Sequence, residues 1–158
     1  MEKIRVVLAD DNISVLRLLT DYFAGTPDIE LVKAVSDGAQ VVDAVRALRP
    51  DVLVTDIIMP RRDGFRILEE LGELPEQERP RVIVLTGLSR DDLILRAVKL
   101  GASYYMVKPF DARLLACRIR EVASSFEEMC IRDRWSSARI LSPAKWPSSC
   151  SWGACWRT

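Results

Sequence analysis

Hydrophobic and polar positions divide the chain into two alternating kinds of segment. Short runs rich in Val, Ile and Leu are typical of strands, and the longer stretches between them repeat apolar residues at helical spacing. The pattern predicts five strands, near residues 4–9, 30–35, 51–55, 81–85 and 104–107. It predicts five helices, near residues 13–24, 38–48, 64–73, 90–100 and 111–126. This strict alternation favours the α/β class, with a five-stranded parallel, doubly wound sheet and right-handed crossovers.

Two of the predicted helices carry an apolar stripe that should pack on the sheet. In the first helix the stripe comprises Val15, Leu16, Leu18, Leu19, Tyr22 and Phe23. The last helix begins at Asp111, which is a favourable N-cap residue. Its expected buried residues are Leu114, Leu115, Ile119 and Val122. Cys117 lies in the same helix, and we expect it to be a small core residue.

The residues after 128 have a different composition. All four tryptophans fall there, and no helical or alternating pattern continues. Residues 129–134 match the translated end of a transposase adapter used in sequencing libraries. We therefore predict a domain over residues 1–127 and an unstructured tail over residues 128–158, and we hypothesise that the tail is a sequencing or assembly junction artefact. A Trp-rich segment that binds a ligand or a membrane surface is the alternative.

Charge and composition exclude several classes of protein. The chain holds 23 basic and 23 acidic residues and no histidine. Residues 1–128 carry a net charge of −4 and residues 129–158 a net charge of +4, so the predicted domain has no basic field that attracts nucleic acid. Acidic residues interrupt the apolar start, and no apolar run approaches the roughly 18 residues that span a bilayer. We expect a cytoplasmic protein with no membrane partner. Without histidine, histidine kinase and Ser-His hydrolase chemistry are excluded.

Four charged residues stand where the predicted strands end. Asp10 and Asp11 follow the first strand, Asp56 follows the third and Lys108 follows the last. In a parallel sheet these ends meet at the carboxyl edge, where open α/β folds bind ligands. Clustered carboxylates repel one another unless a cation joins them, and Mg²⁺ is the simplest hard cation with oxygen ligands. A carboxylate beside Mg²⁺ and a fixed ammonium can become an aspartyl phosphate.

These residues lie in motifs that identify a family. The motifs are residues 9–12, 56–64, 85–87, 101–102 and 108–110. On them, the chain resembles response-regulator receiver domains over about residues 2–126, which implies a (βα)5 flavodoxin-like fold. Within the family, the sequence of residues 56–60, 101–105 and 108–111 is most similar to that of regulators of sporulation in endospore-forming bacteria.

The resemblance implies a phosphorylation site that uses Mg²⁺. Asp56 corresponds to the residue that accepts the phosphoryl group. The carboxylates of Asp10, Asp11 and Asp56, with the backbone carbonyl of Ile58, correspond to the metal ligands. The metal offsets charge on the transferring group and aligns it for in-line attack. Such a domain is not an enzyme towards a separate substrate, because it catalyses only its own phosphorylation and dephosphorylation.

Further residues would stabilise the phosphate and transmit its presence. The resemblance implies that Lys108 pairs with Asp56 and then with the phosphate, after a cis bond to Pro109. Thr86 would give its hydroxyl to a phosphate oxygen. Phosphorylation adds about two negative charges, so that Thr86 moves towards the phosphate and Tyr105 turns inward. This movement repacks the face formed by the fourth helix, fifth strand and fifth helix, which in the family dimerises or contacts an effector.

The expected partners follow from the same resemblance. The phosphodonor is a histidine phosphotransfer protein or a histidine kinase, and phosphorylation favours a homodimer. DNA is contacted only through a C-terminal domain that this chain lacks. Ile58 and Leu88, two residues after Asp56 and Thr86, are apolar and cannot orient an attacking water. We therefore expect slow hydrolysis of the phosphoryl group.

Simpler readings of the same residues remain open. Asp11 or Asn12 could merely cap the first helix, Thr86 could be an ordinary strand-end residue, and Lys108 could be a surface lysine. A stand-alone receiver that passes phosphate along a relay is the main alternative function. An aspartate-nucleophile phosphohydrolase is disfavoured, because that chemistry normally needs a second acid two residues after the nucleophile, where this chain has Ile58. A dinucleotide-binding fold is disfavoured, because no glycine-rich motif follows the first strand.

Overall fold

Five parallel strands form one sheet in the order β2-β1-β3-β4-β5. The computed structural model describes residues 3–87 and 90–133. The strands are β1 (Ile4–Ala9), β2 (Ile29–Val35), β3 (Val52–Asp56), β4 (Arg81–Thr86) and β5 (Tyr104–Val107). Every strand lies within a residue or so of its predicted position, and the predicted α/β class with a parallel sheet is confirmed.

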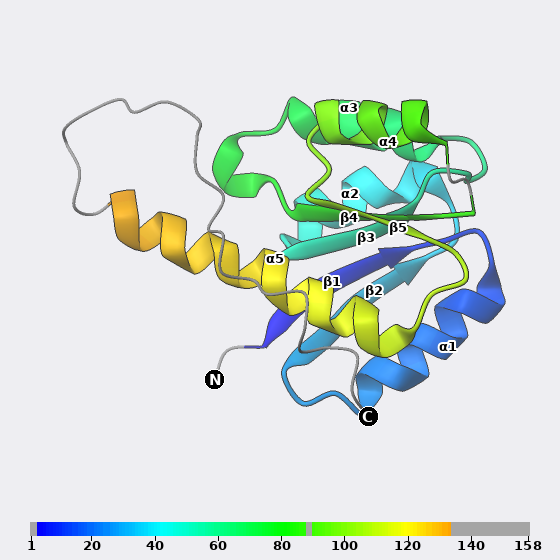
Figure 1. Cartoon of the computed structure of the whole chain (residues 1–158), viewed down its shortest axis with the longest axis horizontal. Coiled ribbons are helices and arrows are strands. Elements are labelled where there is room, and N and C mark those ends of the chain that lie inside the picture. The colour runs from blue at the N-terminus through cyan, green and yellow to red at the C-terminus, as the bar shows by residue number, and fades with distance from the viewer. Residues whose placement is uncertain (1–2, 88–89, 134–158) are drawn as a thin grey trace.

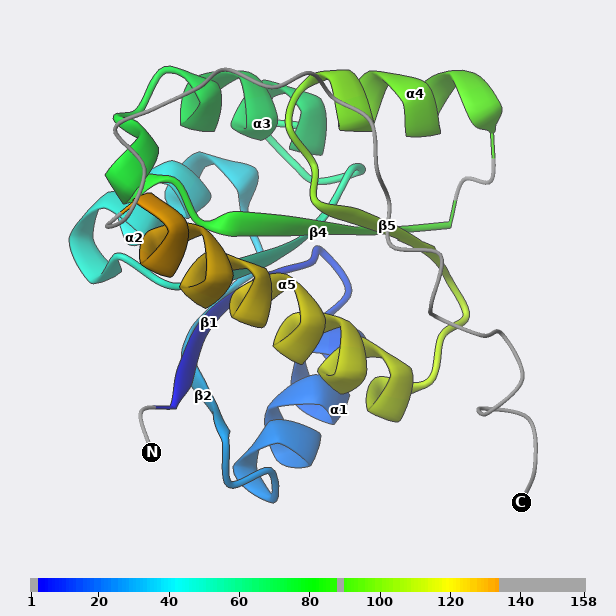
Figure 2. The same cartoon turned by 60° about the vertical axis from the view of Figure 1, so that its left-hand side comes forward.

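Helices cover both faces of this sheet. They are α1 (Ile13–Ala24), α2 (Val41–Leu48), α3 (Gly64–Gly72), α4 (Asp91–Lys99) and α5 (Ala112–Asp133), with the short 3₁₀ helices η1 (Gly38–Gln40) and η2 (Glu76–Glu78). Figures 1 and 2 show α1 and α5 on one face of the sheet and α2, α3 and α4 on the other. The sheet is therefore doubly wound, as predicted.

The strands are apolar because both of their faces are buried. Along β1, Val6 and Leu8 pack with α1 and α5, whereas Val7 and Ala9 pack with α2 and α3. Strand residues alternate between the two faces, and each face here meets a layer of helices. This explains why β1, β3 and β4 read as nearly continuous apolar runs.

The last helix is longer than the sequence pattern predicts. α5 continues to Asp133, past the predicted end at residue 126 and across the predicted boundary between residues 127 and 128. No proline or glycine interrupts Ala112–Asp133, so nothing in its composition ends the helix early. The domain boundary itself stays a prediction, because residues 134–158 lie outside the described residues. Within the described part, no helix is both long and apolar enough to span a membrane.

Three residues predicted to be buried are exposed. Leu18 is 58% exposed and Leu114 is 45% exposed. Cys117 is exposed too, and Ala116 takes the core position beside it. A helix turns about 100° per residue, so only part of its surface faces the sheet. These helices contain more apolar residues than that part of the surface can bury. Cys117 lies two residues after the buried Leu115 and therefore points away from the sheet.

Adjacent leucines on α1 provide a test of this packing. Leu19 is fully buried and Leu18 is mostly exposed. Leu19→Ala should lower the free energy of unfolding by about 2–5 kcal/mol, because it leaves a cavity beneath α1. Leu18→Ala should change it by less than about 0.5 kcal/mol, as is usual at the surface. Urea unfolding monitored by circular dichroism measures both, and equal losses would contradict the orientation of the helix.

Candidate functional site

Three carboxylates converge at the carboxyl edge of the sheet. Asp10 follows β1 and Asp56 ends β3, and these two strands are paired neighbours. Each of Asp10, Asp11 and Asp56 offers an oxygen, and these oxygens lie within 4.8 Å of one another. Asp10 and Asp56 are buried, at 0% and 5% exposure, whereas Asp11 is exposed. The cluster is therefore closed on its inner side and open to solvent at Asp11.

Lys108 joins the two buried carboxylates. Its Nζ lies 2.6 Å from Oδ2 of Asp10 and 2.6 Å from Oδ2 of Asp56. The Lys108 backbone N–H donates to the carbonyl of Thr86 at 2.7 Å, which fixes the lysine to the end of β4. The bond from Lys108 to Pro109 is cis, the isomer that the sequence resemblance implies. Lys108 is thus a half-buried ion-pair partner, and the surface-lysine reading is wrong.

The second oxygen of each buried carboxylate binds the local backbone. Oδ1 of Asp10 accepts from the N–H of Asn12 at 2.9 Å, and Oδ1 of Asp56 accepts from the N–H of Ile58 at 3.1 Å. Asn12 caps α1 by accepting from Ser14 and Val15, so the cap is Asn12 and not Asp11. Asp11 is consequently not needed as a helix cap, which weakens the simpler reading of the pair.

Burial and charge oppose each other in this cluster. Burial raises the pKa of Asp10, against the lowering effect of its hydrogen bonds to Lys108 and the Asn12 backbone. Burial alone would lower the pKa of Lys108, but its hydrogen bonds to Asp10 and Asp56 outweigh this and the pKa is raised. Two of the three carboxylates therefore share one firmly protonated ammonium, and the cluster favours an added cation.

The remaining predicted residues surround this centre. Thr86 is fully buried at the end of β4. Tyr105 on β5 is half-buried against the α2, α3 and α4 side of the core. Burial first, and then the charges of Asp56 and Asp92, raise the pKa of Tyr105, which places its ring within the field of the cluster. Ile58 is 55% exposed. Leu88 lies outside the described residues.

Gly64 lies at a close backbone contact beside the site. Its N–H donates to the carbonyl of Ile57 at 2.7 Å. A Cβ at this position would lie 2.5 Å from the backbone oxygen of Asp56, which is too close for any other residue. The start of α3 is therefore pressed against the end of β3. Only the sequence order, a glycine eight residues after the strand-end aspartate, hinted at this contact.

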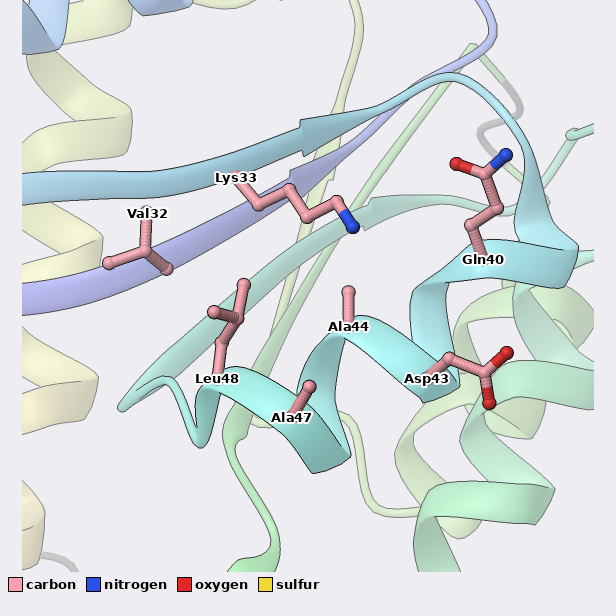
Figure 3. A pocket seen from close by; sticks show the side chains of 7 residues that line it. All are labelled: Val32, Lys33, Gln40, Asp43, Ala44, Ala47 and Leu48. Carbon is pink, nitrogen blue, oxygen red and sulfur yellow. The ribbon is translucent and has the colours of Figure 1, made fainter.

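A groove of about 420 Å³ lies elsewhere, between β2 and α2 (Figure 3). Figure 3 shows Lys33 extending from β2 towards Ala44 of α2, with Leu48 below it. None of the four charged residues of the cluster lines this groove. The concave surface and the reactive groups thus occupy separate places, and the carboxylate cluster is the stronger candidate site.

Comparison with known proteins assigns the family. A family model described as response regulator receiver domain matches residues 6–120. The response regulator domain of CheB from Thermotoga maritima is 27% identical, with a TM-score of 0.70, and the match covers 78% of this chain and 98% of that one. The CheX-CheY-BeF3-Mg²⁺ complex from Borrelia burgdorferi matches with 25% identity and a TM-score of 0.68, covering 77% and 90%. The receiver domain of NarL from Mycobacterium tuberculosis, at 24% identity, shares the fold with a TM-score of 0.72, covering 78% and 98%. The chain belongs to the response regulator receiver domain family.

Removing Lys108 should show how much its pairing with Asp10 and Asp56 contributes to the free energy of unfolding. In EDTA at pH 7, Lys108→Met should lower the free energy of unfolding by about 1–3 kcal/mol, because two buried carboxylates lose their cation. The loss should shrink towards about pH 5. Because the pKa of Asp10 is raised, the folded state takes up a proton at a higher pH than the unfolded state does as the pH falls. Once its carboxyl is neutral, Asp10 needs no cation.

Urea unfolding at both pH values measures this effect. Lys99→Met, which changes an exposed lysine on α4, is the matched control and should have little effect at either pH. An equal loss at both pH values would show that Lys108 stabilises the fold by some means other than pairing with carboxylates.

Proposed function

We propose that this receiver domain is a phosphoacceptor in which Asp56 takes a phosphoryl group from a histidine phosphotransfer protein or a histidine kinase. The observation that carries the proposal is the buried Asp56 carboxylate, held 2.6 Å from the Lys108 ammonium inside a cluster of three carboxylates. The chain's catalysis is limited to its own phosphorylation and dephosphorylation, so it is not an enzyme towards a separate substrate.

The donor set of the cluster fits Mg²⁺. Three carboxylates face one ammonium, and their oxygens lie close enough together to share one ion. Asp10, Asp11 and Asp56 would hold it, with the backbone carbonyl of Ile58. When bound, the ion offsets negative charge on the transferring group. The Borrelia burgdorferi complex, which contains Mg²⁺ and BeF3, supports this proposal by similarity.

The neighbours of Asp56 suit the transfer step. A carboxylate oxygen of Asp56 attacks the phosphorus, the P–N bond to the donor histidine breaks, and the histidine nitrogen keeps the electron pair. Lys108 then offers its ammonium to a phosphate oxygen in place of one of its present contacts. Thr86, buried at the end of the adjacent strand β4, would give its hydroxyl to another.

We assign the output to the α4-β5-α5 face. Phosphorylation moves Thr86 and turns Tyr105 inward, and the repacked face forms a homodimer. Apolar side chains support a contact there, because α4, β5 and α5 each expose at least one. These residues are Leu95, Val98, Val107 and Leu114. In the parent protein, dimerisation would control DNA binding and transcription through a C-terminal domain, as in sporulation-type regulation in the cytoplasm. The alternative is a stand-alone relay receiver, in which phosphorylation would not promote dimers.

Loss of the acceptor carboxylate tests the central proposal. Asp56→Asn should abolish labelling by a small phosphodonor such as ³²P-acetyl phosphate with Mg²⁺, because an amide oxygen is a poor nucleophile and forms no stable acyl phosphate. Asp21→Asn, which changes an exposed aspartate on α1, should label like the wild type. Undiminished labelling of the Asp56 variant would place the acceptor elsewhere.

The lifetime of the phosphoryl group should be long. Ile58 is exposed beside the site, and its apolar side chain cannot orient a water for attack. We expect phospho-Asp56 to persist well beyond seconds with Mg²⁺ present, and Ile58→Gln to shorten its half-life several-fold. Loss of label after donor removal measures this, with Ile13→Gln as the control because Ile13 is similarly exposed. Decay of the wild type within seconds would contradict the proposal.

A further inference from the structure

Two loops at the carboxyl edge of the sheet are joined beside the carboxylate cluster. Asp37 lies in the turn between β2 and η1, and Arg61 lies in the loop between β3 and α3. Nη1 of Arg61 is 2.6 Å from Oδ2 of Asp37. The Asp37 carboxylate is largely buried, and its other oxygen accepts from the N–H of Ala39 at 2.9 Å. Asp37 is therefore fixed in place by its own turn, and Arg61 reaches to it.

The backbone at Arg61 adopts a conformation that needs support. Its φ of 65° lies in the left-handed region, which side chains other than glycine rarely occupy. Such residues persist where the surroundings determine their conformation, and they cluster at functional sites. The guanidinium of this left-handed residue forms the ion pair with Asp37.

The two loops also meet through their backbones. A Cβ on Gly38 would lie 2.0 Å from the carbonyl oxygen of Arg62, so only glycine fits. The turn after β2 is thus pressed against the loop after β3, and the Asp37–Arg61 ion pair joins the same two segments. Movement of one loop cannot be independent of the other.

The joined loops reach both sides of the carboxylate cluster. The loop of residues 57–63 follows directly from Asp56 and contains Ile58, whose N–H donates to the Asp56 carboxylate. On the other side, the carbonyl of Val35 at the end of β2 accepts from the N–H of Asp10 at 3.1 Å. The segment from Val35 to Asp37 therefore connects the backbone of Asp10 with the loop that carries Ile58.

We propose that Asp37 and Arg61 are positioning residues of the phosphoacceptor site, and that their ion pair holds the Ile58 carbonyl at the place where Mg²⁺ binds. This inference rests on the proposed function. In this proposal neither side chain is a ligand of the metal or a contact of the phosphoryl group. Arg61 is mostly exposed, so the pair contributes little to global stability, and its effect should appear in Mg²⁺ binding.

A double-mutant cycle on the full chain tests the pair. Arg61→Ala removes the guanidinium, and Asp37→Asn removes the charge while keeping an amide oxygen for the N–H of Ala39. Each single variant should weaken Mg²⁺ binding about tenfold, as for residues that orient a metal ligand from behind. The double variant should be no weaker than either single one, because one interaction is lost in all three. Arg61→Lys should recover most of the affinity.

Titration with MgCl₂ followed by amide NMR gives the dissociation constant, and urea unfolding is measured in parallel. Arg49→Ala is a matched control. Arg49 is also left-handed, with a φ of 45°, and its guanidinium pairs with Glu78 at 2.9 Å. It follows α2 and precedes β3, at the opposite edge of the sheet, so its loss should leave Mg²⁺ affinity unchanged.

Three outcomes separate this inference from the function beneath it. Equal losses of affinity in both single variants and in the double variant, with unchanged unfolding midpoints, support the positioning role. A wild type that binds Mg²⁺ and labels at Asp56, with variants that bind Mg²⁺ equally well, overturns this inference alone. A wild type that neither binds Mg²⁺ nor labels overturns the proposed function and the inference with it.

Discussion

The contact of one ammonium with two buried carboxylates determines how the carboxyl edge of this sheet is built. Asp10 and Asp56 end neighbouring strands, and a parallel sheet brings those ends together whatever follows them. Two carboxylates in that position repel each other and lose hydration, which is why burial raises the pKa of Asp10. Lys108 comes from the far side of β4 to lie between them. The contact therefore requires that the segment between β5 and α5, which contains Lys108, bring the ammonium back across β4.

The same hydrogen-bonded turn occurs at the carboxyl ends of β1, β2 and β3. Asp10, Asp37 and Asp56 follow or end β1, β2 and β3, and each accepts a hydrogen bond from the backbone N–H two residues later. This short-range turn binds one carboxylate oxygen and leaves the other for a partner across space. For Asp10 and Asp56 that partner is Lys108, and for Asp37 it is Arg61. One backbone motif thus orients both the buried carboxylates of the cluster and the residue that pairs with Arg61 in the neighbouring loop.

Much of this arrangement could be predicted from the sequence because it follows from strand order. Alternating strands and helices with charged residues at the strand ends place Asp10, Asp56 and Lys108 together by topology alone. The exposure of Leu18, Leu114 and Cys117 could not be predicted, because the rotation of a helix is set by packing against its neighbours. The link between Asp37 and Arg61 gave no sequence signal either. It depends on a left-handed residue in one loop and a close backbone contact with another, and neither has a periodic pattern.

The cluster divides into a fixed half and an open half, and this division suits the proposed chemistry. Asp10, Asp56 and Lys108 are held from within by hydrogen bonds to one another and to the backbone. Asp11 and Ile58 lie on the exposed side, where a hydrated cation and a protein donor would approach under the proposed function. A loop on this open side lacks the support of the sheet, so it needs an anchor of its own. In the positioning role proposed above, the ion pair between Arg61 and Asp37 supplies that anchor.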